Sequence, residues 1–376
     1  MTEKRLPRLL VLIGSGETAP RMTRVHRSVI RRLAGPNGAA ADVTAVVIDT
    51  PFGFQENADE LSTHLVDYFG RRLGMRTGIA SYRRRDVEIL HRETALARVG
   101  EADFVFSGPG SPSYAIRQWQ HSAFGELFSR RLRDGGALVF ASAAALTIGR
   151  LTVPVYEIYK AGEDPHWLPG LDVLGSVGIS AAIIPHFDNN EGSGHDTRFC
   201  FLGERRFRML EEQLPDDVHI LGIDEHTALL LDLDQHSASV RGRGKVTVRH
   251  SGASREFAAG SEFSIDLLRG HGDAVSDAHG PADARGPSAV TDERASTALA
   301  RRTLELEKQV GTLSERADRG DALVEALIDL RRVARERGDY QTADSIRKRL
   351  AAAGVELRDD AAGSTSYRSD LKEEPG

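Results

Sequence analysis

The chain has 376 residues, of which 40% are hydrophobic and 28% are charged, and its formal net charge is −6. This length predicts one large domain, or two with a tail, and the composition provides enough apolar sequence for a sizeable core. The negative balance argues against a protein that binds nucleic acid over its whole surface, although a local basic face stays open. The single cysteine, Cys200, excludes an intrachain disulfide framework and a multi-cysteine metal site.

The longest early apolar run, Leu9–Ile13, is too short for a signal peptide or a membrane span. We therefore expect a soluble, cytoplasmic protein that has no membrane partner. From Leu9 to about Leu268, short apolar runs (LLVLIG, TAVVID, ADFVFSG and GALVFA) alternate with helical patterns such as 57–73 and 113–132. Apolar strands that alternate with helices are typical of a parallel sheet covered on both faces, so the predicted fold class is α/β.

The pattern changes after Asp232. Short runs at 238–240, 245–249, 256–258 and 263–268 indicate strands, which we interpret as a small β appendage that closes a domain of residues 1–268. Residues 269–292 hold almost no large apolar side chain, which predicts a disordered linker. Residues 293–368 are predicted to be α-helical, with a helical hairpin over 322–337 and 340–353, and residues 369–376 to be disordered.

In open α/β sheets, ligands and chemistry gather at the carboxyl ends of the strands. GSGE at 14–17 indicates either a loop whose amides approach a ligand or a tight turn, and without GxGxxG it implies no dinucleotide. SGPGSPSY at 107–114 leaves the backbone exposed at Gly108 and Gly110, as an oxyanion hole requires, unless it only forms a loop with two turns.

The segment ALVFASAAALTIG, 137–149, runs from a strand into a small residue, then Ser142, then more small residues and a helix. This is the arrangement of a nucleophile elbow, where the helix N-terminus stabilises a developing oxyanion. An ordinary serine N-cap has the same pattern, and this stretch alone favours the N-cap.

An apolar run leads into His186, which suits a general base at a strand end. A metal site is the weaker alternative, because loops with such scattered ligands are usually false positives, and we expect neither a metal nor a cofactor. That site would use His186, Asp188, Glu191, His195 and Asp196.

The same segment contains other polar groups that could line a pocket. Arg198 could hold a carboxylate or a phosphate through two hydrogen bonds, and His195 and Asp196 could take part in proton transfer, unless the segment is only a solvated loop. Cys200 lies between two phenylalanines, which predicts a buried structural thiol.

The ordered set GSGE, TPFGFQEN, SGPGSPSYAIRQW, ASAAA, IIPHF and ILGIDEHTALLL resembles the dipeptidase E and cyanophycinase family, the serine-nucleophile relatives of class I glutamine amidotransferases. The resemblance covers about residues 9–268. It implies a flavodoxin-like three-layer sandwich with a mostly parallel sheet, and an enzyme that cleaves acidic or aspartate-linked peptides through a Ser–His–acid constellation.

The resemblance also implies roles for individual residues. Ser142 matches the nucleophile and His186 the base. Glu225, in GIDEHTAL, is the preferred acid to orient the base, and Glu157, in VPVYEIYK, competes with it. The oxyanion-hole positions match Gly108, Gly110 and the amide of Ala143.

The elbow departs from the family pattern, which has glycine two residues on either side of the serine. This chain has Phe140 and Ala144 there, and we expect the bulkier Phe140 either to crowd the turn or to force a different backbone there. Two function classes therefore stay open. The first is a serine hydrolase of a small peptide, amide or ester substrate, and the second is a non-catalytic scaffold of the same fold.

The tail, LVEALIDLRRVARERGDYQTADSIRKRLAAAGVELRDDAAGSTSYR at 323–368, resembles the C-terminal helical region of cysteinyl-tRNA synthetase. The shared features are an RxxAR core, a short break, an AD-IR-L helix, a GVxLxD turn and a G-T-x-aromatic-R ending. In that synthetase the region belongs to the anticodon-binding part, which implies tRNA as a partner here. The implied RNA contacts are Arg331, Arg332, Arg335, Arg347, Arg349 and Tyr367.

Carboxylates lie among these arginines, and mixed charge on helices usually indicates a solvated face. A helical hairpin that docks or forms a homo-oligomer is therefore the alternative for the tail. The chain lacks the HIGH and KMSKS signatures of the synthetase and its zinc-ligand cysteines. It is therefore not expected to aminoacylate tRNA.

Overall fold

The computed structural model describes residues 5–192, 194–250 and 252–269, together with Arg347, Leu350 and two short strands at 355–359 and 365–369. The chain forms two compact units, Met1–Asp277 and Ala278–Gly376. The predicted linker after Arg269 and the helical hairpin lie outside the described residues, apart from Arg347 and Leu350. Within the described part of the chain, no helix is long and apolar enough to cross a membrane.

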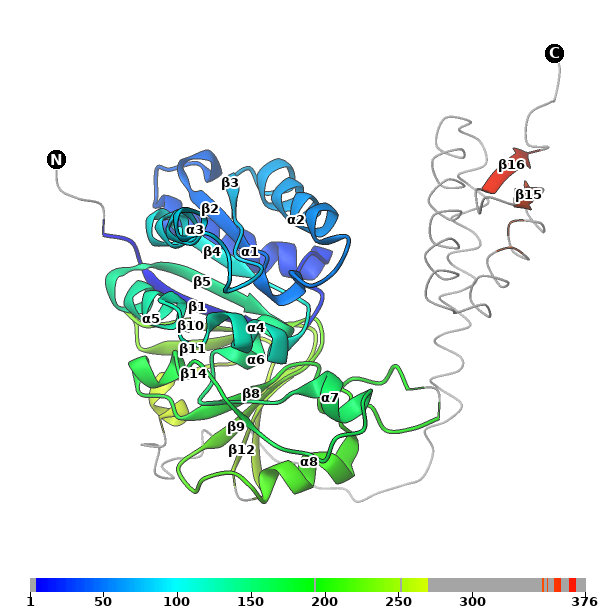
Figure 1. The fold of residues 1–376 in the computed structure, drawn as a ribbon. Helices are drawn as coiled ribbons and strands as arrows, with labels where there is room; N and C mark the ends of the chain where they lie inside the picture. The colour runs from blue at the N-terminus through cyan, green and yellow to red at the C-terminus, as the bar shows by residue number, and fades with distance from the viewer. Residues whose placement is uncertain are drawn as a thin grey trace, which may run out of the picture. The chain divides into compact units, whose positions relative to one another are not determined.

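The first unit contains two sheets (Figure 1). In the first sheet, β1, β5, β4, β2 and β3 are parallel, and an antiparallel extension of three strands follows on the other side of β1. Its strands in spatial order are β14 (Glu262–Ser264), β11 (Ser237–Gly242), β10 (Thr227–Asp232), β1 (Arg8–Ile13), β5 (Gly136–Ala141), β4 (Phe104–Ser107), β2 (Thr44–Ile48) and β3 (Arg76–Ala80).

The second sheet is smaller and mixed. Its strands in spatial order are β13 (Ala253–Ala258), β12 (Lys245–His250), β9 (His219–Ile223), β8 (Ala181–Ile184), β6 (Leu151–Thr152) and β7 (Leu168–Pro169). The strands predicted after Asp232 are present, and they are continuous with both sheets. Strand β11 pairs with β10 and β12 pairs with β9, and inward-facing residues such as Val240 and Val246 are fully buried.

The α-helices are α1 (Pro20–Ala34), α2 (Ala58–Asp67), α3 (Ile89–Glu101), α4 (Pro112–Trp119), α5 (Phe124–Asp134), α6 (Ala143–Thr147), α7 (Val155–Tyr159) and α8 (Gly203–Glu211). Five shorter turns are η1 (Ala40–Asp42), η2 (Thr50–Phe52), η3 (Tyr68–Arg72, a π-helical turn), η4 (Leu174–Val177) and η5 (Ile265–Leu268). The helical pattern predicted over 113–132 is two helices, because the backbone turns at His121, whose φ is 62°.

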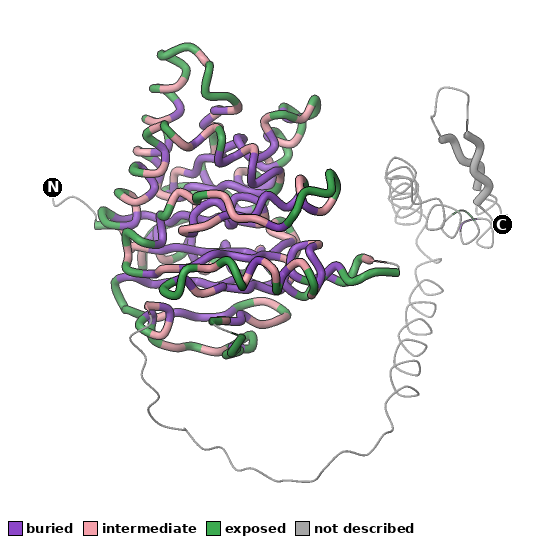
Figure 2. The backbone as a smooth tube through the Cα atoms, turned by 60° about the horizontal axis from the view of Figure 1, so that its bottom comes forward, coloured by how far each residue is buried: buried purple, intermediate pink, exposed green. Residues whose placement is uncertain are grey.

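Alternate residues of β1 bury their side chains in two different cores, as the strand period of two requires. Leu9, Val11 and Ile13 belong to the core under α1, whereas Leu10 and Leu12 belong to the core that includes α5 and the second sheet. A third core lies between the second sheet and α8. Figure 2 shows the buried residues concentrated along the strands. The predicted flavodoxin-like α/β sandwich with a mostly parallel central sheet is confirmed.

In the second unit, β15 (Val355–Asp359) and β16 (Thr365–Ser369) pair antiparallel, with Leu357 opposite Tyr367. The prediction that 293–368 is helical is wrong for these strands, and Ser369, predicted disordered, ends β16. Apolar and polar residues alternate in VELRD, which is the strand period. Of the predicted RNA-contacting arginines, Arg347 is helical and exposed. The others, Arg331, Arg332, Arg335 and Arg349, lie outside the described residues.

Candidate active site

Ser142 lies at an abrupt junction between a strand and a helix. It follows β5 directly and precedes α6, and its backbone has φ 50° and ψ −121°. A non-glycine residue rarely adopts a positive φ, so this is a strained turn of the kind found in nucleophile elbows. The Ser142 amide donates to the carbonyl of Ile13 over 3.0 Å, which ties the turn to the end of β1.

The departures from the family pattern are accommodated at this turn. The Phe140 ring is fully buried and packs edge-on against Phe128, with 5.1 Å between the ring centroids. The amide of Ala144 donates to the Gly108 carbonyl over 3.2 Å. The expected crowding by Phe140 is therefore absent, because its ring occupies the core beside α5.

His186 follows β8 and lies between the serine and a carboxylate. Its Nε2 is 2.9 Å from the Ser142 Oγ, and its Nδ1 is 2.8 Å from the Glu225 Oε1. The His186 and Glu225 side chains are 18% and 24% exposed, so the pair is only partly shielded from water. With the proton on Nδ1 donated to Glu225, Nε2 is free to accept the hydroxyl proton of Ser142.

Glu225 is itself held from both ends. The side-chain amide of Asn189 donates to Glu225 Oε1 over 3.1 Å, and the backbone amide of Glu225 donates to Asp188 Oδ1 over 2.6 Å. The hydrogen bond from His186 is the largest influence on this carboxyl and lowers the pKa of Glu225 below its usual value. An ionised Glu225 favours the imidazole tautomer that the serine needs.

Glu157, the competing acid, lies elsewhere. It is on α7, and its Oε1 accepts a hydrogen bond from Ser113 Oγ over 2.5 Å. Its Oε2 is buried and has no partner among the described residues. Of the two glutamates, the structure therefore brings Glu225, and not Glu157, to the imidazole.

A left-handed turn supports the backbone of His186. Phe199, Cys200 and Phe201 have φ values of 59°, 57° and 68°. The amides of Phe199 and Cys200 donate to the carbonyls of Phe187 and His186 over 3.0 and 3.1 Å. Each such residue costs about 1–2 kcal/mol, so surrounding contacts must offset the strain. Cys200 is buried, as predicted, and burial raises the pKa of its thiol to about 12.

The predicted oxyanion positions lie in the loop after β4 and at the start of α6. Gly110 has φ 144°, and a Cβ there would lie 2.0 Å from the Pro51 carbonyl oxygen, so only glycine fits. The Gly110 amide has no hydrogen-bond partner among the described residues. The Ala143 amide belongs to the first turn of α6, where amides have no partner within the helix.

The structure places Arg198 and His195 outside the hydrogen-bonded set. Two nitrogens of the Arg198 guanidinium donate hydrogen bonds to the Asp196 carboxylate over 2.9 and 2.8 Å, and one of them also contacts Glu204 at 3.3 Å. It is therefore already paired within its own loop. His195 is exposed, and its ring stacks on Tyr159 with 6.2 Å between the centroids.

Within the ranges that the structure describes, no group of three His, Cys, Asp or Glu side chains is placed to hold a metal ion. The geometry therefore does not support the alternative of a metal site. Among the five residues considered, His186 faces Glu225, and Asp188 accepts from the Glu225 amide. Asp196 pairs with Arg198 instead.

The sequence interpretation missed two features of the site. Asp188 and Asn189 hold Glu225, and their signal was the polar run directly after His186. Glu17, from the GSGE loop, is near the imidazoles of His186 and His226, and burial is the main influence that raises its pKa. No sequence pattern indicates that the GSGE loop after β1 and the GIDEHTAL segment at the end of β9 lie together.

Comparison with solved structures identifies the architecture. A peptidase from an acI-B1 Actinobacterium matches 69% of this chain and 98% of its own length, with a TM-score of 0.55 and 22% identity. The chain has the fold of that peptidase. A candidate peptidase E protein from Listeria monocytogenes EGD-e matches 67% of this chain and 98% of its own, at a TM-score of 0.41 and 12% identity, which is too low to establish a common fold. No protein-family model matches the chain.

A short sequence match concerns a different protein. Cysteine–tRNA ligase of Wolbachia pipientis subsp. Culex pipiens (strain wPip) is 46% identical over 48 residues, which are 13% of this chain. The match spans only 10% of the length of that ligase.

Proposed function

We propose that the first unit is a serine hydrolase of the dipeptidase E and cyanophycinase type, which cleaves a peptide, amide or ester bond. The observation that carries the proposal is the pair of hydrogen bonds from Ser142 to His186 and from His186 to Glu225, at 2.9 and 2.8 Å. The strained backbone of Ser142 and the likeness to a peptidase fold support it.

The proposed reaction has two halves. His186 Nε2 takes the hydroxyl proton as Ser142 Oγ attacks the scissile carbonyl carbon, and the amides of Gly110 and Ala143 stabilise the oxyanion. The protonated imidazole then gives its proton to the leaving nitrogen or oxygen, which leaves an acyl-serine. Water, deprotonated by His186, releases the acid and restores Ser142. Glu225 orients the imidazole and stabilises its positive charge throughout.

A serine-reactive fluorophosphonate probe tests this proposal. We expect the probe to modify Ser142, as mapped by mass spectrometry, and the modification to disappear in Ser142→Ala and His186→Ala. Ser113→Ala is the matched control, because Ser113 bonds Glu157 and not the imidazole. A folded chain that takes up no probe would overturn the proposal in favour of the non-catalytic scaffold.

We propose as a second function that the tail binds tRNA. The 46% identity over 48 residues to a cysteine–tRNA ligase favours it. Binding through phosphates predicts an affinity that falls as salt rises, and Arg347→Glu in the full chain should weaken it, since Arg347 is exposed. Equal tRNA affinity of wild type and a variant with Arg332, Arg335 and Arg347 all changed to Glu would sink this idea. A lower oligomeric mass in solution after removal of residues 293–376 would then indicate that the tail serves oligomerisation.

A further inference from the structure

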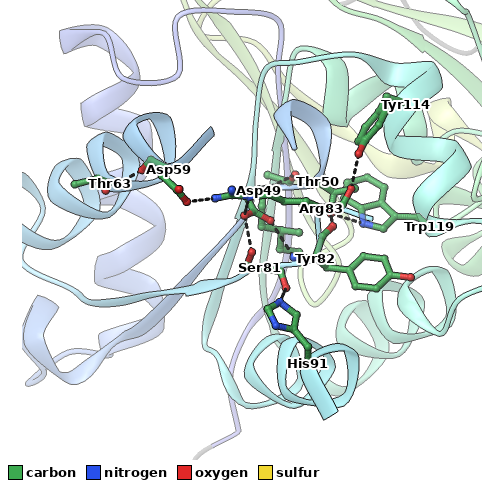
Figure 3. A network of polar contacts seen from close by, with 12 residues as sticks. Asp49, Thr50, Asp59, Thr63, Ser81, Tyr82, Arg83, His91, Tyr114 and Trp119 are labelled. Carbon is green, nitrogen blue, oxygen red and sulfur yellow. Dashed lines mark hydrogen bonds and ion pairs between the residues drawn. The ribbon is translucent and has the colours of Figure 1, made fainter. Parts of the chain in front are cut away.

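Asp49 is a fully buried carboxylate directly after β2. It accepts hydrogen bonds from Ser81 Oγ, the Tyr82 amide and Arg83 Nε, at 2.8, 2.9 and 2.7 Å (Figure 3). The same arginine also contacts Asp59 at 2.6 Å, but the Asp59 side chain is 92% exposed. A buried carboxylate with three donors is well satisfied, and it fixes the backbone of the loop after β3.

This loop in turn holds α4 at two points. The Tyr114 hydroxyl donates to the Arg83 carbonyl over 2.7 Å. The Trp119 indole donates to Thr50 Oγ1 over 3.0 Å, and Thr50 donates to the Tyr82 carbonyl over 2.5 Å. Figure 3 shows these side chains converging on the loop. The first turn and the last residue of α4 are therefore tied to the residues that Asp49 orders.

The start of α4 is the part nearest the oxyanion positions. The Ser111 amide donates to the Pro51 carbonyl over 2.8 Å, and Gly110 packs directly on the same carbonyl. Pro51 belongs to the turn η2, whose C-cap is Gly53. Gly53 packs against the loop after β3, since a Cβ on Gly53 would lie 2.7 Å from the Cβ of Arg83. The turn η2 is therefore held between the loop that Asp49 orders and the Gly108–Gly110 loop.

We propose that Asp49 is a positioning residue that keeps the Gly110 amide in place for the oxyanion. This inference rests on the proposed hydrolase function. Asp49 touches no reacting atom, and it acts through the turn η2 and α4. A donor displaced by about 1 Å loses on the order of a hundredfold in rate, so Asp49→Asn should slow acylation of Ser142 about 10- to 100-fold.

The experiment compares Asp49→Asn with Asp59→Asn, which removes the exposed carboxylate from the same arginine. Two quantities are measured on each full-length variant. The first is the fluorophosphonate labelling rate constant at Ser142 as a function of pH. The second is amide hydrogen exchange in peptides that cover residues 107–116. We expect Asp49→Asn to lower the rate constant at every pH, with an unchanged pH midpoint, and to speed exchange, while Asp59→Asn does neither.

The outcomes separate the two proposals. A lower labelled fraction with an unchanged rate constant means partial unfolding and overturns the positioning role, as does slower labelling without faster exchange. If wild type itself is not labelled, the hydrolase proposal fails, and hydrogen exchange alone decides whether Asp49 holds the loop. Should Asp49→Asn not fold, Tyr114→Phe removes only one link and should slow labelling about two- to fivefold, in line with a net hydrogen bond of about 0.5–1 kcal/mol. An unchanged rate would overturn the inference.

Discussion

Ser142 and its two partners reach the site by different means. Ser142 directly follows β5, a central strand of the first sheet that is paired on both sides, and α6 begins at the next residue. His186 and Glu225 follow β8 and β9 of the second sheet, and side chains and a left-handed turn hold them. Local backbone geometry thus sets the serine, whereas the imidazole and carboxylate depend on contacts between distant segments. Changes near His186 should alter the rate at which Ser142 is labelled. Changes at Ser142 should also alter the free energy of unfolding, because its backbone is strained.

The largest expected effect concerns the acid. Glu225→Gln should lower the Ser142 labelling rate about 10³- to 10⁴-fold, because an amide cannot hold the imidazole in the required tautomer. Glu157→Gln, which changes a carboxylate that contacts Ser113, should cost less than about tenfold. The rate constants come from time courses of probe incorporation. Equal losses in both variants would mean that the geometry at β9 does not determine the rate.

A second prediction concerns stability at the end of β9. Asp224 is 4% exposed, and burial raises its pKa from 3.8 to about 6. The folded chain binds this proton more tightly than the unfolded chain does, so the free energy of unfolding should fall as pH rises from about 4 to about 6. Relative to Asp224→Asn, wild type should lose about 2 kcal/mol between pH 4 and pH 8. Urea unfolding at both pH values measures this, and a parallel pH dependence would contradict it.

A smaller effect is expected at Asn189. Its side-chain amide donates to Glu225, and the residue is fully buried. Asn189→Ala should slow labelling about tenfold, which corresponds to one hydrogen bond of about 1.4 kcal/mol. Asn190→Ala is the matched control, since Asn190 is exposed. If the two variants labelled equally fast, the support of the carboxylate would not matter for the rate.

The smallest effect tests the serine turn. Both Ser142→Ala and Ser142→Gly remove the hydroxyl, but only glycine adopts φ 50° and ψ −121° without strain. The glycine variant should be more stable than the alanine variant by about 1 kcal/mol, after the larger entropy of its unfolded chain is counted. Denaturant unfolding of the pair provides the comparison. A more stable alanine variant would show that this turn is unstrained.

The sequence was sufficient for the α/β fold class, because apolar runs that alternate with helical patterns are visible locally. The expectation that Ser142 and His186 act together came from the family resemblance, since β5 and β8 lie in different sheets and no local pattern joins their ends. The preference for Glu225 over Glu157 came from the resemblance as well, because the contact between Glu225 and His186 depends on where β9 lies beside β8. The turn at Phe199–Phe201 contains no Gly, Asn or Asp, the residues that usually indicate a positive φ. The network around Asp49 joins segments that are far apart in the sequence, so it could not be predicted either.

Strand order has a consequence for biosynthesis. Strand β1 lies between β5 and β10, and β10 follows Glu225 in the chain. A ribosome therefore releases the serine and the imidazole before the carboxylate, and the central sheet cannot close until β10 has emerged. Under the proposed hydrolase function, the nascent polypeptide is expected to gain the complete hydrogen-bonded set of Ser142, His186 and Glu225 only after these later strands have been made.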